Sequence, residues 1–238
     1  MILLPAIDLK DGQAVRLYKG DYNQKTVYSN SPEKIACEFE TMGAKWLHLV
    51  DLDGAKDGMY KNVETIKKIK QSTNLKIQLG GGIRNIETIK MYLEEIGIDR
   101  VILGTAALNE PEFLKAAIKL YGPSKIVVGV DVKNEKVATS GWLKTSDVDY
   151  IDFIQYLESI NITTIVVTDI SKDGTLQGPN FDMYKKIKDK TKIQFIVSGG
   201  IKDAQNIKDV AKLDYYGCIL GKAYYEGKVD LVEVLNAL

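Results

Sequence analysis

A two-part glycine motif occurs twice in this chain and constrains the fold more than any other feature of the sequence. In the first copy, an apolar run ends in Gly81-Gly82, and a second short run ends at Gly104. In the second copy, the corresponding runs end in Gly199-Gly200 and at Gly221. Gly81 and Gly199 lie 118 positions apart (199 − 81), which is about half of the 238 residues. A repeat of that length predicts two similar half-barrels, about residues 1–122 and 123–238.

Each copy of the motif has the chemistry of a phosphate site. Two neighbouring strands that end in glycine just before a helix place unsatisfied backbone amides and positive helix ends around one point. We therefore expect two phosphate sites on opposite sides of one mouth. The alternative is that each Gly-Gly forms only a tight turn. The candidate residues are Gly81, Gly82, Gly104 and Thr105 in the first half and Gly199, Gly200, Gly221 and Lys222 in the second.

Short apolar runs alternate with amphipathic helical segments along the whole chain. This order is typical of βαβ units and a parallel sheet. Eight of each favours an α/β fold of the closed (β/α)8 TIM-barrel type over an open doubly wound sheet, and the length is usual for one such domain. The expected strands are 2–8, 46–51, 76–79, 100–103, 126–131, 164–168, 194–197 and 217–220.

Helix and loop signals complete this single-domain prediction. Ser31 is expected to cap a helix that stops at Gly43, and Asn85 another that ends at Gly97. A hairpin is expected at 136–142, and the long polar loops 20–30 and 171–180 are expected to be mobile flaps. The remaining helices are expected at 62–71, 109–121, 150–159, 180–190, 203–213 and 230–238.

Charge and composition exclude several classes of function. Lys+Arg and Asp+Glu balance at 32 each, so no net field favours nucleic acid or an acidic membrane. No apolar run is long enough to span a membrane, and the N-terminus opens into a strand rather than a signal peptide. We therefore expect a cytoplasmic protein, and a monomer. Cys37 and Cys218 lack metal-ligand spacing and are expected to be buried free thiols.

Two carboxylates are candidates for acid–base chemistry. Asp8 and Asp131 end the first strand of each half, and in a (β/α)8 barrel the carboxyl ends of the strands form the active face. The repeat places the two opposite one another, which suits catalysis with one group ionised and the other protonated. The alternative is that each caps its own loop. Other carboxylates near the mouth, expected mainly to shape loops, are Asp51, Asp53, Asp169 and Asp173.

The remaining candidates have a structural alternative in every case. If Asp51 points into the barrel, strand alternation turns the sole histidine, His48, to the opposite side, which favours a structural role over catalysis. A single histidine also disfavours a Ser-His-Asp triad or a His-based metal site. Trp142 lies on a loop and either stacks on a planar heterocycle or covers the hairpin. Cations that could meet phosphate or lie on the solvated surface are Arg16, Arg84 and Lys222.

Several segments together resemble a known family across the whole chain. They are L-P-A-I-D-L-K-D-G, V-R-L-Y-K-G-D, H-L-V-D-L-D-G-A, G-G-G-I-R, L-G-T-A-A, S-G-W, T-D-I-S-K-D-G-T-L-Q-G-P-N and S-G-G-I. The combination is similar to the phosphoribosylformimino-5-aminoimidazole carboxamide ribotide (ProFAR) isomerases of histidine biosynthesis. The resemblance implies an aldose–ketose isomerase that converts the aminoaldose ProFAR into the aminoketose PRFAR by an Amadori rearrangement. It also implies a small-molecule bisphosphate substrate and neither cofactor nor metal.

The resemblance also implies roles for individual residues. Asp8 would be the general base that removes the C2 proton, and Asp131 the acid that helps to open the furanose. Asp173, on the mobile loop, is the rival acid, and Thr168 matches a hydroxyl beside the substrate. The binding roles would fall on Arg16 and Arg84, which would hold one end of the substrate, and on Trp142, which would stack on the aminoimidazole.

Three other functions stay open. The cyclase subunit of imidazole glycerol phosphate synthase is a sister barrel with the same phosphate sites and paired aspartates. Its start reads C-L-D-V, however, where this chain reads A-I-D-L. A nonenzymatic sugar-phosphate-binding barrel would bind the ligand without turnover and would leave Asp8 and Asp131 without a purpose. A bifunctional isomerase would also act on phosphoribosylanthranilate.

Overall fold

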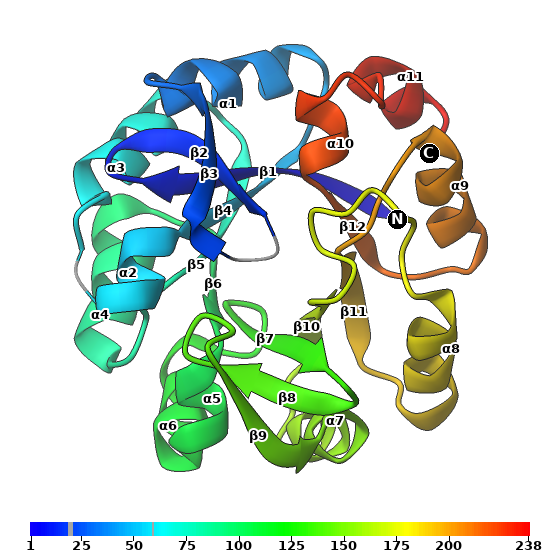
Figure 1. The fold of residues 1–238 in the computed structure, drawn as a ribbon. Helices are drawn as coiled ribbons and strands as arrows, with labels where there is room; N and C mark the ends of the chain where they lie inside the picture. Colours follow the sequence, from blue (N-terminus) through cyan, green and yellow to red (C-terminus); the bar gives the residue numbers. More distant parts are fainter. Residues whose placement is uncertain (19–20, 59) are drawn as a thin grey trace.

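Eight parallel strands close on one another into a barrel (Figure 1). The computed structural model describes residues 1–18, 21–58 and 60–238. Closure is made where Ile2 of the first strand pairs with Gly217 of the last, and the two halves also meet where Leu103 pairs with Val128. The barrel strands are β1 (Ile2–Lys10), β4 (Trp46–Asp51), β5 (Lys76–Gly80), β6 (Arg100–Leu103), β7 (Ile126–Lys133), β10 (Thr164–Asp169), β11 (Gln194–Ser198) and β12 (Gly217–Leu220).

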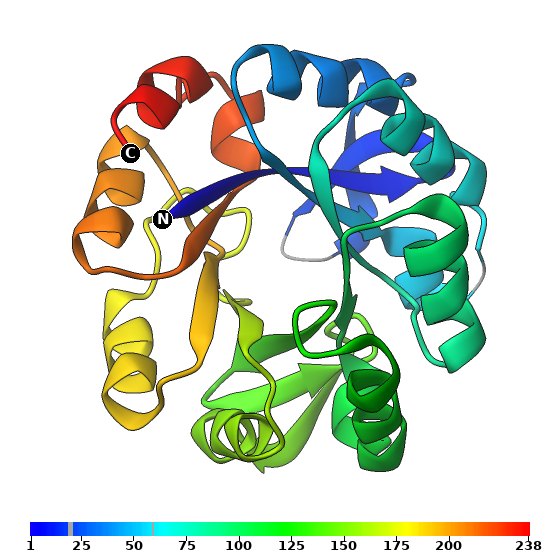
Figure 2. The same ribbon diagram turned by 180° about the vertical axis from the view of Figure 1, so that it is seen from behind.

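Helices form an outer ring around the barrel, as Figure 2 shows from behind. The (β/α)8 fold is therefore confirmed, and each predicted strand lies within two residues of an observed one. Ile66 and Ile69 turn to the barrel and are fully buried, as their helical spacing predicts. The ring consists of α1 (Pro32–Thr41), α3 (Val63–Ser72), α4 (Ile86–Lys90) with the π-helical turn η1 (Met91–Ile96), α6 (Pro111–Tyr121), α7 (Tyr150–Ser159), α8 (Phe181–Lys190), α9 (Ala204–Lys212) and α11 (Leu231–Asn236).

Two separate apolar cores follow from the alternation of side chains along these strands. The larger core lies between strands and helices, because every second strand residue, such as Leu47 and Leu49, faces outward. The smaller core fills the barrel interior with the intervening residues. Its buried members are Leu4, Ala6, Ile102, Val127, Val166, Ile196 and Ile219. The next inward position along each strand lies at the carboxyl end, where the interior opens into a cavity.

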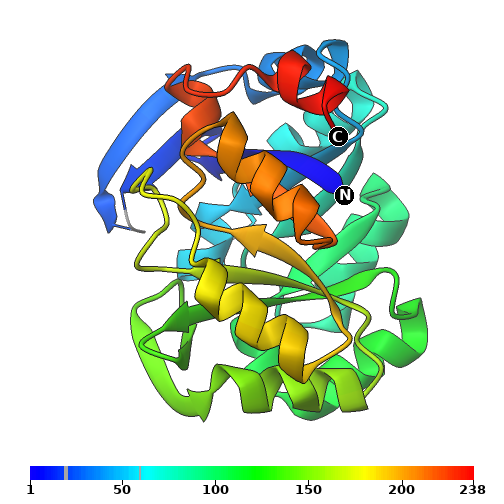
Figure 3. The ribbon, with the colours of Figure 1, turned by 90° about the vertical axis from the view of Figure 1, so that its right-hand side faces the viewer.

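Two antiparallel hairpins extend the barrel on one side (Figure 3). The first consists of β2 (Gln13–Tyr18) and β3 (Asp21–Ser29) and pairs with β1. The second consists of β8 (Lys136–Thr139) and β9 (Lys144–Asp149) and pairs with β7. In Figure 3 both chain ends lie away from these hairpins. The three short helices at strand ends are α2 (Leu52–Asp57), α5 (Thr105–Asn109) and α10 (Lys222–Tyr225).

The first hairpin corrects the prediction of a polar loop at 20–30, whereas the predicted mobility of this segment stays a prediction. Residues 21–29 form a strand with an irregular register, because β2 supplies backbone partners even though most of the exposed side chains are polar. Gly20 lies outside the described residues. The second hairpin is longer than the predicted 136–142 and continues to Asp149. Loop 171–180 is irregular, as expected, but its mobility stays a prediction.

Local signals at helix ends were right in two cases and wrong in one. The side chain of Asn85 accepts from the amide of Thr88 at 2.8 Å, and Gly97 adopts the left-handed conformation with φ of 82°. Ser31 does not cap α1 with its side chain. Instead, its own amide donates to the hydroxyl of Ser29 at 2.9 Å.

The burial of the two cysteines and the lengths of the helices can also be compared with the sequence predictions. Cys218 is buried as predicted, but Cys37 is only half-buried, because it lies on the outer helix α1. Within residues 1–18, 21–58 and 60–238, no helix has the length and apolar character needed to cross a membrane.

Candidate active site

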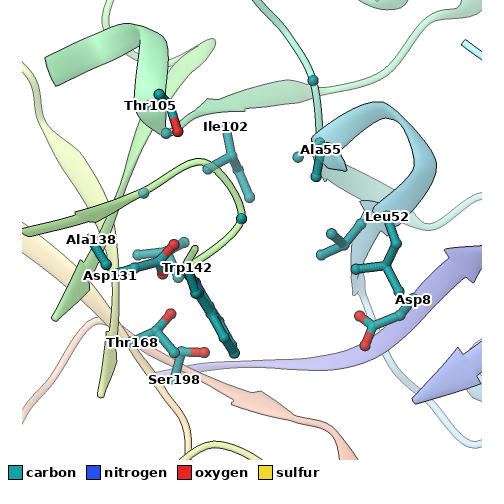
Figure 4. A pocket seen from close by; sticks show the side chains of 18 of the residues that line it. Asp8, Leu52, Ala55, Ile102, Thr105, Asp131, Ala138, Trp142, Thr168 and Ser198 are labelled. Carbon is teal, nitrogen blue, oxygen red and sulfur yellow. The ribbon is translucent and has the colours of Figure 1, made fainter. Parts of the chain in front are cut away.

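A cavity of about 230 Å³ opens at the carboxyl ends of the barrel strands. Figure 4 shows Asp8 on one side of it and Asp131 on the other, and in this view the indole of Trp142 projects between them. Asp8 comes from β1 and Asp131 from β7, the first strand of each half. The structure thus brings the two predicted carboxylates into one cavity, as their matched strand positions indicate.

Asp8 is held by Arg16, which reaches it from the first hairpin. Because the turn after β1 folds β2 back onto it, Asp8 pairs with Val15, and the guanidinium of Arg16 donates to the carboxylate at 2.7 Å. A second nitrogen of Arg16 lies 3.5 Å from the carboxylate of Asp173. Burial raises the pKa of Asp8 above its usual range, Arg16 opposes this rise and Asp173 adds to it.

Among the described residues, Asp131 has no cationic partner of the kind that Asp8 has in Arg16. Burial raises its pKa, hydrogen bonds from Trp142 and Thr168 oppose the rise, and the charge of Asp173 adds to it. Thr168 is adjacent because β10 pairs with β7 in the register Thr168 to Asp131. Within the described chain, no Lys or Arg forms an ion pair with Asp131. The two carboxyl groups of the cavity therefore differ: Asp8 has a cation, whereas Asp131 has only neutral donors.

Trp142 reaches the cavity through an unusual backbone. Ser140, Gly141 and Trp142 have φ of 57°, 62° and 72°, so two residues other than glycine adopt the left-handed region. The amide of Ser140 donates to the hydroxyl of Thr105 at 2.8 Å, which ties this loop to the other half of the barrel. This arrangement directs the indole into the cavity rather than over the hairpin.

The first glycine cluster is part of the main cavity. Its members Gly81, Gly82, Gly104 and Thr105 all line it, and Thr105 begins α5. Arg84 lies at the edge, exposed, and donates to the carbonyl of Ala55 at 3.3 Å.

The second cluster lies in a narrower pocket with a volume of about 20 Å³. Its members Gly199, Gly200, Gly221 and Lys222 line this pocket together with Arg16 and Asp173. The ammonium of Lys222 donates to the carbonyl of Gly174 at 3.0 Å, so the loop after β10 lies across the cluster. Arg16 lines both pockets, whereas Arg84 lines the main cavity, so the expectation that they hold the same end of a substrate stays a prediction.

The backbone at the two clusters matches closely. Gly81 and Gly199 have φ of 113° and 93°, where other residues are rare. A Cβ on Gly81 would collide with the carbonyl of Asp51, and one on Gly199 would lie 2.9 Å from the carbonyl of Asp169. Both positions therefore need glycine for the same reason, the close approach of the preceding strand.

An Asp–Asn pair supports each of those strand ends. Asn62 donates to Asp51 at 2.6 Å, and 118 residues later (180 − 62) Asn180 donates to Asp169 at 2.7 Å. Asp51 also accepts from the amide of Gly54. These aspartates shape loops, as predicted.

His48 corrects the prediction from strand alternation. His48 lines the cavity, whereas Asp51 faces outward. The two residues do lie on opposite sides of β4, as alternation requires, but the assumption that Asp51 points into the barrel was wrong. Nδ1 of His48 lies 2.8 Å from the side-chain nitrogen of Gln78, and Oε1 of Gln78 accepts from Nε of Arg100. The sequence analysis did not identify Gln78 and Arg100, although a polar residue inside an apolar strand is a usable signal.

Ser198 and Tyr22 also line the cavity and were not predicted.

Metal binding has no candidate among the described residues, where no group of three or more His, Cys, Asp or Glu side chains could hold an ion. The expected absence of a cofactor stays a prediction.

Comparison with known proteins identifies similar chains over the whole length. A family model described as histidine biosynthesis protein matches residues 2–230. A protein of Lactococcus lactis subsp. cremoris (strain SK11) is 58% identical over 236 residues, covering 99% of this chain and 96% of the relative. A protein of Clostridium botulinum (strain Alaska E43 / Type E3) is 53% identical, covering 99% of both chains. Both relatives are named 1-(5-phosphoribosyl)-5-((5-phosphoribosylamino)methylideneamino) imidazole-4-carboxamide isomerase.

Proposed function

The chain belongs to the histidine biosynthesis protein family, and from that premise we propose that it catalyses the aldose–ketose isomerisation for which its relatives are named. The substrate is the aminoaldose ProFAR and the product is the aminoketose PRFAR. The reaction is an Amadori rearrangement, in which a proton leaves one carbon of the sugar and another carbon gains one. It therefore needs a base and an acid on either side of one substrate.

The observation that carries this proposal is the pair Asp8 and Asp131 across one cavity (Figure 4). Asp8 has Arg16 at 2.7 Å, and a neighbouring cation stabilises the ionised form that a base needs. Asp131 has neutral donors, and the loss of hydration in the cavity raises its pKa and so favours the protonated form that an acid needs. Different environments for two carboxyl groups are the usual basis for separate acid and base roles.

The reaction then follows in four proton movements. Asp131 donates a proton to the furanose ring oxygen, the ring opens, and the nitrogen at C1 forms a Schiff base. Asp8 removes the proton from C2, which leaves an enolamine. Asp8 returns its proton to C1 of the enolamine, and the C2 hydroxyl gives its proton to Asp131 and becomes the ketone. Both carboxyl groups are thereby restored, and no electrons leave the substrate. Thr168 donates to Asp131 and orients it.

Asp173 is the weaker candidate for the acid. In this conformation its carboxylate lies 3.5 Å from Arg16, so it shares a cation with Asp8 and lies on the side of the base. Asp131 has no such partner within the described chain.

The two glycine clusters are proposed to hold the two phosphates of the substrate. Gly81, Gly82 and Gly104 supply backbone amides at the first, with Thr105 at the start of a helix. Gly199, Gly200, Gly221 and Lys222 do so at the second. Their matched backbone also supports the division into half-barrels of about residues 1–122 and 123–238. Trp142 is positioned to stack on the imidazole between them.

The proposal also covers the location of the protein, its oligomeric state and its need for a cofactor. We infer a cytoplasmic monomer that needs neither a metal nor a cofactor, since the proton movements above use only side chains of this chain. No observation favours the cyclase alternative.

An absorbance assay of aminoaldose turnover tests the proposed function. Purified protein should convert the aminoaldose to the aminoketose without added metal or cofactor. A parallel reaction with phosphoribosylanthranilate decides whether the enzyme is bifunctional. Tight binding of the aminoaldose without turnover would contradict the proposal and favour a nonenzymatic binding barrel.

A further inference from the structure

Three polar side chains lie side by side on adjacent strands inside the barrel. His48 of β4 pairs in register with Gln78 of β5, and Gln78 with Arg100 of β6. All three are buried, with exposed fractions of 9%, 0% and 4%. His48 also lines the catalytic cavity. Arg100 stacks on Trp46 with its guanidinium carbon 4.1 Å from the ring centroid.

The hydrogen bonds of this row fix the orientation of each group. Nε of Arg100 donates to Oε1 of Gln78 at 2.9 Å, and a guanidinium can only donate. The oxygen of the Gln78 amide must therefore face Arg100, because the reverse orientation would set two donors against each other. The NH2 group of Gln78 then faces Nδ1 of His48 at 2.8 Å.

The same logic fixes the proton on the histidine ring. An NH2 group only donates, so Nδ1 of His48 must accept, and in the neutral ring the proton then sits on Nε2. Among the hydrogen bonds within the described chain, none engages Nε2. This N–H is therefore left for a group in the cavity.

Electrostatics keep the ring neutral. Burial, together with the charges of Arg16 and Arg100, lowers the pKa of His48 to about 3. The other charged group that faces the cavity from the neighbouring strand β1 is Asp8, whose carboxylate is engaged by Arg16. The second neighbouring strand, β5, presents the uncharged Gln78.

We propose that Arg100 and Gln78 are positioning residues that hold His48 as the neutral Nε2–H tautomer, and that this N–H donates to an oxygen of the substrate's sugar. The second half of this inference rests on the proposed isomerase function. A neutral imidazole suits the task, because it donates to oxygen at which negative charge develops without adding a cation beside Asp8. Gln78 and Arg100 act only through His48.

The tautomer can be tested without substrate, because His48 is the only histidine in the chain. Full-length protein labelled with ¹⁵N in histidine gives a single ring system in long-range ¹H–¹⁵N spectra. We expect Nε2 to have the shift of a protonated nitrogen and Nδ1 that of an unprotonated one, unchanged from pH 8 to pH 5.5. A proton on Nδ1, or titration within this range, overturns the inference.

Gln78→Glu tests the positioning role, because a carboxylate accepts from Arg100 and also from Nδ1. The ring proton should move to Nδ1, and the ring should gain a second proton at higher pH than in the wild type. Loss of a matched donor leaves a buried polar group unsatisfied, so kcat/KM should fall by about tenfold or more. Gln78→Met, which is similar in size and cannot hydrogen-bond in this way, replaces it if Gln78→Glu does not fold.

Trp46→Phe is the matched control, because it changes another partner of Arg100 and leaves the Gln78–His48 contact in place. It should keep the Nε2–H tautomer and the wild-type kcat/KM. A moved proton in Gln78→Glu with wild-type kcat/KM overturns the proposed donation to substrate. Absence of turnover in the wild type contradicts the isomerase function instead, and the spectra still decide the tautomer.

Discussion

The guanidinium of Arg16 lies directly against Gly221, so a Cβ on Gly221 would lie 2.8 Å from Cζ of Arg16. Gly104 holds the same place in the first half and has nearly the same backbone, with φ and ψ of −100° and −104° against −106° and −111°. A Cβ on Gly104, in contrast, meets no atom of the described chain within 4 Å. The two glycines therefore share a backbone conformation but differ in their surroundings, because Arg16 lies beside Gly221 alone.

Gly221→Ala should therefore cost more stability than Gly104→Ala. Any backbone cost of alanine is shared by the two sites, but at Gly221 the methyl group must displace the buried Arg16 from Asp8. Overpacking of this kind lowers the free energy of unfolding by about 1–3 kcal/mol. Chemical denaturation of both variants in phosphate-free buffer measures the difference. Equal losses would show that Arg16 moves aside freely.

The unequal pockets predict an order of phosphate binding. The first cluster opens into about 230 Å³, whereas the second has about 20 Å³ with Arg16 and Asp173 in its wall. Inorganic phosphate should occupy the first cluster at lower concentration than the second, because the loop carrying Gly174 must leave Lys222 first. A series of phosphate-soaked crystals measures the two occupancies. Density that fills the second cluster first would contradict this order.

The two candidate acids should separate in a kinetic comparison. Asp131→Asn should lower kcat by about 10²–10⁴-fold, the usual contribution of a positioned proton donor. Asp173→Asn should act mainly on KM, because Asp173 contacts Arg16 and the second cluster rather than Asp131. Steady-state kinetics of both variants decide between them. A larger loss of kcat in Asp173→Asn would assign the acid to the loop.

The lowered pKa of His48 predicts that mild acidification reduces the free energy of unfolding. The pKa of the buried ring is lowered from its ordinary 6.5 to about 3. Between these values the unfolded chain binds a proton that the folded protein does not, so stability falls as pH falls. From pH 7.5 to 5.5 the contribution is a loss of about 1.4 kcal/mol. Asp8 and Asp131, with raised pKa values, respond in the opposite sense.

Comparison with His48→Gln isolates this histidine, because the carboxylates titrate in both proteins. Urea denaturation at the two pH values gives the slope for each. The wild type should lose about 1.4 kcal/mol more than the variant. Parallel slopes would mean that His48 titrates in the folded protein.

The barrel could be predicted from the sequence because its strands are short, apolar and bounded by glycine or helix-start residues. The repeat also predicted where Gly81 and Gly199 would lie, since their close approach to Asp51 and Asp169 tolerates no side chain. The orientation of a strand could not be predicted in the same way. Both faces of a barrel strand are buried, so periodicity in β4 does not say whether His48 or Asp51 faces inward.

The tertiary contacts that form part of the site could also not be predicted from the sequence. Arg16 reaches Asp8 because β2 folds back onto β1, and the polar side chains of β3 did not indicate a hairpin. The link from Ser140 to Thr105 joins a loop to the start of α5, 35 residues away, and Ser140 itself has a positive φ. Such contacts depend on the exact positions of loops, for which short-range patterns carry no signal.

The most direct test of the account is kcat for the Asp8→Asn variant. Asparagine keeps the shape of the side chain and removes its basicity, so kcat should fall by at least about 10²–10⁴-fold. KM should change little, because the phosphates provide most of the binding. Circular dichroism must first establish that the variant is folded. A folded Asp8→Asn protein with near wild-type kcat would contradict Asp8 as the base, whatever the occupancy of the two glycine clusters.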